Sequence, residues 1–112
     1  MEYMASIPLK HVAKEESLPE RFERLAASWE EAVAHHSSES SRTRHPAYQE
    51  IIALGPPVIP LLLRDMERRQ GHWFAALVAL SGVNPVAASD AGKVAKMIQV
   101  WLQWGRENGY QW

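Results

Sequence analysis

Histidine is the residue type in this chain best suited to acid–base chemistry, because imidazole titrates near neutral pH. His45 and His72 each stand at the start of an expected helix, where either side chain could cap the helix or face solvent. A second interpretation brings both histidines together with a carboxylate such as Glu50. The spacing does not require that convergence. A small enzyme using His45 and His72 as acid–base groups is therefore kept as an alternative function, and no catalytic residue is assigned.

A second histidine cluster carries the ligand types of a metal site. His35 and His36 are adjacent, and Glu39 follows three residues on. Adjacent positions point in different directions on a helix, and the helix dipole already favours histidine near a helix C-terminus. The chain also has no cysteine, which excludes disulfides, thiolate zinc sites and cysteine nucleophiles. We expect no metal site and no cofactor.

The motifs of nucleophilic catalysis and phosphate binding are missing. The sequence has no G-x-S-x-G, H-E-x-x-H, G-x-x-x-x-G-K-[ST] or G-x-G-x-x-G pattern. Asp65 and Glu67 lie two residues apart on an expected helix, so they face different ways and make a poor carboxylate pair. The pattern favours a protein without enzymatic activity.

The overall charge argues against a dedicated polyanion binder. Twelve Lys and Arg residues against thirteen Asp and Glu residues leave a formal net charge of −1. A nucleic-acid-binding regulatory protein is kept as an alternative, since two helices joined at 54–57 faintly suggest a helix-turn-helix. Its second helix would present Asp65 and Glu67 beside the basic residues, which phosphates would resist. The cations of that alternative are Arg42, Arg44, Arg64 and Arg68.

The five tryptophans divide into two groups. Trp29, Trp73 and Trp101 fall on the apolar faces of expected helices and are predicted to be core residues. The remaining aromatic residues near the C-terminus are Trp104, Tyr110 and Trp112. They could form an exposed rim of the kind that anchors protein interfaces, or the tail could fold back and bury Trp112. These three residues are the predicted protein-binding site.

The elements that must position these side chains are all helical. Ser17 and Glu20 form a capping-box pattern, and apolar residues then recur at helical spacing. The sequence predicts helices over 18–35, 46–54, 58–69, 72–81 and 90–108, preceded by a flexible arm over 1–16 and interrupted by an exposed linker over 37–44. Residues 17–112 thus form a single all-α domain, a compact bundle of about five helices. The helix over 72–81 is apolar almost all round, so we expect it at the centre.

Three finer expectations concern how these helices begin, end and face. The charged residues of the helix over 58–69, Asp65 among them, are expected to face water. Gly71 is expected to end that helix. Ser89 or Asp90 is expected to cap the start of the last helix. No apolar run reaches the length of a membrane span, and no membrane association is expected.

Two stretches resemble known families. ALGPPVIPLLLRDM followed by WFAALVALSG, within residues 47–82, resembles a single HEAT-like αα unit, which implies helical packing and contacts with other proteins. HPAYQEII, HWFAAL, NPV and WLQWGRENGY, within residues 45–110, look like a family of small bacterial helical proteins with no assigned activity. That resemblance implies a bacterial, cytoplasmic protein whose gene travels with that of a partner.

These observations favour a non-enzymatic protein-interaction module. The chain would bind another protein, or a second copy of itself, as an accessory, adaptor or antitoxin-like component of a bacterial operon. The absence of catalytic and metal-binding patterns, together with the aromatic residues near the C-terminus, supports this interpretation.

Overall fold

The computed structural model describes residues 16–34 and 39–112, and all regular structure within them is helical. This confirms the all-α prediction. Residues 1–15 of the arm expected over 1–16, and the pair His35 and His36, lie outside the described residues. The α-helices of the described part are α2 (Leu18–Val33), α3 (Glu39–Thr43), α4 (Pro46–Ala53), α5 (Ile59–Arg69), α6 (Phe74–Ser81) and α7 (Val94–Glu107), with two short 3-10 helices, η2 (Pro56–Val58) and η3 (Ala88–Asp90).

The first long helix begins as its sequence predicts. The Ser17 hydroxyl accepts from the Glu20 backbone N–H at 3.2 Å, and the Glu20 carboxylate accepts from the Ser17 N–H at 2.9 Å. Glu16 lies just before this cap. The Arg24 guanidinium, on α2, donates to the Glu16 carboxylate and lowers the pKa of that carboxyl below its ordinary value. Folding therefore favours the charged carboxylate. The pair stabilises the fold at pH values above the ordinary pKa of glutamate, and this stabilisation is lost as the pH falls through the lowered pKa.

The expectation of an exposed linker over 37–44 is wrong at 39–43, whereas Arg44 is exposed and lies outside any helix. Glu39–Thr43 forms the short helix α3. The indole N–H of Trp29, on α2, donates to the backbone carbonyl of Arg42 at 2.7 Å, and the Arg42 guanidinium lies over the Trp29 ring, 5.9 Å from its centroid. Serine and threonine have weak helix propensity, so a buried tryptophan on another helix, rather than local sequence, holds this turn in place.

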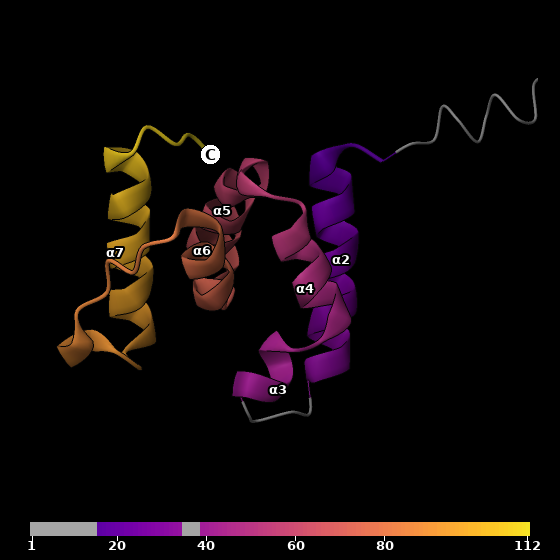
Figure 1. Cartoon of the computed structure of the whole chain (residues 1–112), viewed down its shortest axis with the longest axis horizontal. Coiled ribbons are helices and arrows are strands. Elements are labelled where there is room, and N and C mark those ends of the chain that lie inside the picture. Colours follow the sequence, from indigo (N-terminus) through magenta and orange to yellow (C-terminus); the bar gives the residue numbers. More distant parts are fainter. Residues whose placement is uncertain (1–15, 35–38) are drawn as a thin grey trace, which may run out of the picture.

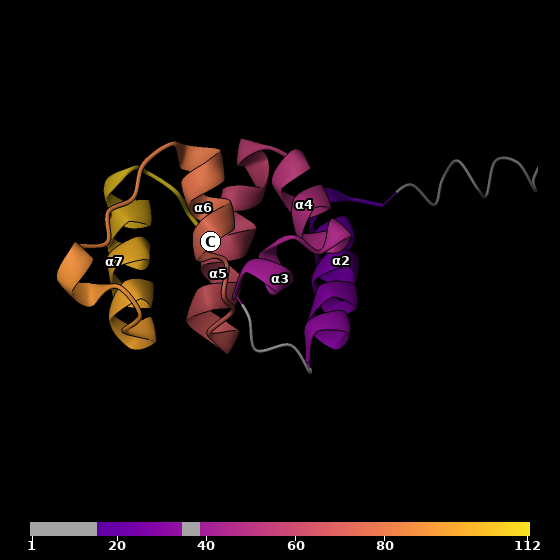
Figure 2. The same cartoon turned by 60° about the horizontal axis from the view of Figure 1, so that its bottom comes forward.

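The centre of the molecule is α5, not the apolar helix expected there. α7 lies at one end and α2 at the other, with α5 and α6 between α7 and α4 (Figures 1 and 2). The inward side chains of α5 are fully buried, Leu62, Leu63 and Met66 among them. On α6, only Ala76 and Leu77 are buried, whereas Val78 is 37% exposed. Because α6 is apolar all round, its sequence does not indicate which face is buried. In the structure only one of its faces is covered.

An aromatic cluster joins α2, α4 and the start of α6. The Trp73 ring packs on Trp29, Tyr48 and Phe22, with centroids 4.8, 5.4 and 5.5 Å away. The Tyr48 hydroxyl accepts from the Ala76 N–H at 3.0 Å and donates to the His72 carbonyl at 3.4 Å, so it fixes the first turn of α6. Trp29, Trp73 and Trp101 are all buried, which confirms their prediction as core residues.

Asp65 is buried, contrary to its expected exposure, with only 6% of its surface accessible. Its Oδ2 accepts from the Trp73 indole N–H at 2.7 Å, and its Oδ1 lies 3.7 Å from the Arg69 Nε. The end of α5 also differs from the prediction, because Gln70 rather than Gly71 adopts the left-handed conformation, with φ 58°. The carboxylate thus ties the end of α5 to the residue that precedes α6.

Candidate protein-binding surface

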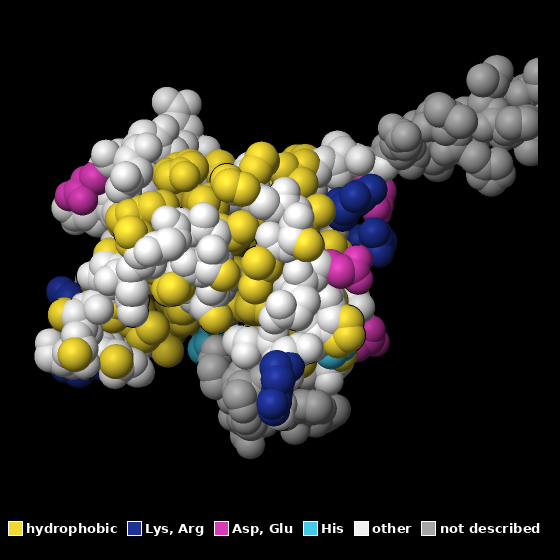
Figure 3. Space-filling view, viewed as in Figure 1, with side chains coloured by type: hydrophobic (Ala, Val, Ile, Leu, Met, Phe, Trp, Pro, Cys, Tyr) yellow, Lys and Arg dark blue, Asp and Glu magenta, His cyan; other side chains and the backbone are white. Residues whose placement is uncertain are grey.

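The outer side of α6 is an apolar helix face that the rest of the described chain leaves uncovered. The sequence of α6, FAALVALS, contains no charged residue. Ala75, Val78 and Ala79 are exposed, and Val83, just after the helix, is 46% exposed. Hydrophobic side chains gather across this side of the molecule, over α6 and the segments next to it, and charged side chains lie toward its edges (Figure 3). Exposed apolar surface that is contiguous rather than scattered is a feature of protein-binding sites.

A groove continues this face toward the start of α7. It has a volume of about 380 Å³, and its lining is mostly apolar. The residues that line it are His72, Phe74, Ala75, Gly92, Val94 and Met97. The rings of His72 and Phe74 lie 5.6 Å apart at 58°, which places an aromatic wall on the α6 side. A concave apolar site with an imidazole at its rim has the composition of a ligand-binding groove.

The start of α7 carries two exposed positive charges. Lys93 and Lys96 are exposed, adjoin lining residues in the sequence, and pair with no carboxylate among the described residues. α7 begins at Val94 with Lys93 as its N-cap and no acid in its first turn, so the expected cap by Ser89 or Asp90 is wrong. Those two residues belong instead to η3. Lysine at the positive end of a helix dipole is unfavourable for the helix itself.

The predicted aromatic rim is engaged within the chain. Asn108 ends α7, and Gly109 and Tyr110 donate backbone N–H groups to the carbonyls of Arg106 and Gly105, which turns the chain back along the helix. The Tyr110 ring stacks on Trp104, with centroids 5.4 Å apart. The tail therefore folds back, which was one of the two alternatives.

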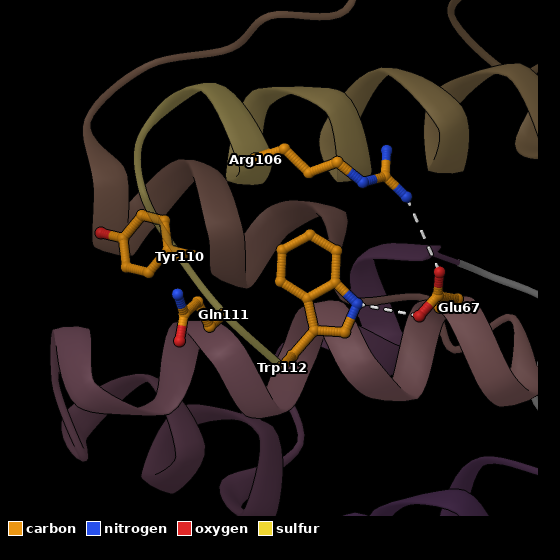
Figure 4. Close-up of a pocket in the computed structure, with 5 residues that line it drawn as sticks. All are labelled: Glu67, Arg106, Tyr110, Gln111 and Trp112. Carbon is orange, nitrogen blue, oxygen red and sulfur yellow. Dashed lines mark hydrogen bonds and ion pairs between the residues drawn. The ribbon is translucent and has the colours of Figure 1, made fainter.

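Trp112 closes this arrangement over α5 (Figure 4). Its indole N–H donates to Glu67 at 2.9 Å, and the Arg106 guanidinium lies 5.6 Å from its ring centroid. A shallow hollow of about 330 Å³ remains between these side chains, Tyr110 and Gln111. Trp104, Tyr110 and Trp112 are all partly buried, and their role in protein binding stays a prediction.

The two histidines of the enzyme alternative have separate positions. His45 caps α4, where its Nδ1 accepts from the Ala47 N–H at 3.0 Å. His72 lies at the rim of the apolar groove. No hydrogen bond or ion pair within the described residues joins either imidazole to a carboxylate, and Glu50 is exposed. Among these same residues, no three potential metal-ligating side chains come together.

The four arginines of the nucleic-acid alternative are spread over α3, α5 and the two-residue segment between α3 and α4. Arg42 lines a hollow of about 340 Å³ with Trp29 and His72, and neither Arg44, Arg64 nor Arg68 lines it. The Nε of Arg42 is buried beside the Trp29 ring and has no hydrogen-bond partner among the described residues. Arg44 and Arg68 are exposed.

The chain matches no protein-family model, no curated protein and no solved structure. No helix in the described ranges is long and apolar enough to cross a bilayer. The binding surface therefore has to be inferred from geometry. Sequence reasoning missed the outer face of α6 because an apolar helix is compatible with full burial and with an interface.

Proposed function

We propose that this protein is a non-enzymatic interaction module that binds another protein through the outer face of α6 and the adjoining groove. The observation that carries the proposal is a helix without charged residues whose outer side is exposed. Burying apolar surface is the main favourable term in protein association. An accessory, adaptor or antitoxin-like role in a bacterial operon is part of the same proposal.

The way α6 is held supports this function. Its inner side is fixed by Ala76, Leu77 and the Tyr48 hydroxyl, so its outer side is presented on a rigid support. A preorganised surface loses little conformational entropy on binding, which favours affinity. We propose further that α4, α5 and α6 form a HEAT-like αα unit, the architecture in which neighbouring helices usually continue the stack. A partner helix would then cover α6.

The test is capture from cells that express the protein natively, with a matched pair of variants. Val78→Lys places a charge in the middle of the apolar face, and Ala27→Lys places the same side chain at an exposed position of α2. We expect a protein that is retained by the wild type and by Ala27→Lys and lost with Val78→Lys. That protein is then purified, and its dissociation constant is measured with all three chains.

A weakening of more than tenfold for Val78→Lys alone is expected, since a lysine would bring an unpaired charge into an apolar contact. Circular dichroism checks that both variants keep the wild-type helix content. Retention of the same partner by all three chains, with equal affinity, would remove α6 as the binding surface.

A further inference from the structure

We propose that the hollow beside α3 binds a small oxyanion, a carboxylate or a phosphate, through the guanidinium of Arg42. This hollow has a volume of about 340 Å³. It is lined by residues of α2, by Arg42 on α3, and by residues at the end of α5 and in the segment before α6. No residue of α6 itself lines it, so the inference goes beyond the proposed function and does not depend on it.

The guanidinium of Arg42 has hydrogen-bond donors that the described residues leave unpaired. Its Nε is buried and has no hydrogen-bond partner among them. No described carboxylate forms an ion pair with this side chain either. Buried polar groups nearly always have a partner, and one without a protein partner points to a bound water or ion. Because a guanidinium is charged and can only donate, an oxyanion satisfies it more completely than water does.

The contacts that Arg42 does make hold it in place without using these donors. Its guanidinium lies over the Trp29 ring, 5.9 Å from the centroid, and its backbone carbonyl accepts from the Trp29 indole N–H at 2.7 Å. Trp29 therefore restrains both the backbone and the side chain of Arg42. A cation that is already positioned loses little conformational entropy when it binds a ligand.

The shape of the guanidinium suits an anion with two oxygens. Its Nε and one terminal nitrogen donate in the same direction, so they can hold two oxygens of one carboxylate or phosphate. Arg42 is half-buried and lines the hollow, although its Nε is enclosed. The anion therefore meets the terminal nitrogens first, and a rotation of the guanidinium over the flat Trp29 ring brings the Nε to the second oxygen.

The charges that line the hollow admit an anion. Arg42 and Arg69 line it against a single carboxylate, Glu30. Arg69 neutralises that carboxylate, since its terminal Nη2 lies 2.7 Å from the Glu30 Oε1. The charge of Arg42 thus remains without a counter-ion in the lining.

The size of the hollow limits the ligand to a small molecule. A volume of about 340 Å³ accommodates a carboxylate or phosphate together with a small organic group. Two further polar residues, Gln70 and His72, line the hollow and carry N–H groups that can donate to the remaining oxygens. A polyanion gains little here, because its affinity depends on several aligned cations.

The experiment titrates the whole, ¹⁵N-labelled chain with sodium phosphate and, separately, with sodium acetate. Ionic strength is kept constant with sodium chloride, so that general screening does not change. The Nε–H resonance of Arg42 and the indole N–H resonance of Trp29 are followed by NMR. We expect both resonances to shift and to saturate with the same dissociation constant, in the range of about 1 mM. Saturation by phosphate or by acetate alone identifies which of the two oxyanions is bound.

Two variants and a matched control test the role of Arg42, with binding followed at the Trp29 indole. Arg42→Gln should abolish saturable binding, and Arg42→Lys, which keeps the charge but loses the paired donors, should weaken it at least fivefold. Arg68→Gln removes the same charge from an exposed position of α5 that does not line the hollow, and it should bind like the wild type. Circular dichroism checks that each variant keeps the wild-type helix content.

Three results would overturn the proposal. The first is no shift with either anion, in which case water alone satisfies the Arg42 Nε. The second is a shift that rises linearly without saturation, as a non-specific ion effect does. The third is saturable binding that Arg42→Gln leaves unchanged. The loss of a captured partner with Val78→Lys is independent of all three, so the two proposals fail or stand separately.

Discussion

At the residue scale, the contact between Asp65 and Trp73 shows how one side chain sets the relation of two helices. Asp65 accepts a buried hydrogen bond from the indole N–H, and Gly71 leaves room for it. A Cβ at position 71 would overlap both the Asp65 carboxylate and the Trp73 ring. The glycine is therefore required for close approach and not for a left-handed turn, which Gln70 makes instead. The helical spacing alone predicted an exposed Asp65. The sequence does not show that the Trp73 indole supplies a buried hydrogen-bond donor to this carboxylate.

Gly71→Ala should lower the free energy of unfolding by about 3 kcal/mol, the sum of a weakened buried hydrogen bond to a charged acceptor and local overpacking. Gly82→Ala is the control, since a Cβ there meets no neighbour and costs only the left-handed conformation, about 1 kcal/mol. Urea unfolding monitored by tryptophan fluorescence measures both. Equal losses for the two variants would contradict the close packing described for Gly71.

At the element scale, helices with a one-sided apolar pattern were predicted well, and the others were not. α2 carries a capping box and a single apolar face, so its start and its core residues Phe22, Leu25 and Trp29 follow from sequence. α3 depends on a hydrogen bond from another helix, which no local pattern contains. For α6, periodicity could not say which side would be buried. The candidate surface was missed for that reason, and the groove was missed because it is formed by segments about twenty residues apart.

Trp112→Ala separates the C-terminal tail from α6 as the binding element. The indole packs on Gly105 and donates to Glu67, so its loss should cost about 2 kcal/mol of stability, less than the 3–5 kcal/mol of a fully buried tryptophan. Partner affinity should change by less than about twofold, since the side chain does not line the α6–α7 groove. Thermal unfolding and titration with the captured partner measure the two effects. A loss of affinity with unchanged stability would instead make the tail the interface, as the sequence predicts.

At the scale of the whole molecule, the distribution of charge favours the proposed protein partner over a nucleic acid. Several arginines form ion pairs with carboxylates: Arg24 with Glu16, Arg69 with Glu30 and Arg106 with Glu67. The sequence predicted a near-neutral chain but could not predict these pairings, because they join residues of different helices or precede the helix itself. Among the described residues, the remaining cations are few and separate, and a phosphate backbone gains little from them or from the apolar face of α6.

The chain should therefore bind heparin only weakly and elute below about 200 mM salt. Affinity for a polyanion falls steeply with salt in proportion to the number of phosphates or sulfates contacted, so a protein with few aligned cations has both weak binding and a shallow dependence. Arg44→Gln/Arg68→Gln should shift the elution only slightly, as should Lys93→Gln/Lys96→Gln. Elution well above that salt concentration, with a large shift for the first pair, would favour the nucleic-acid alternative. A large shift for the second pair would instead place the polyanion at the start of α7.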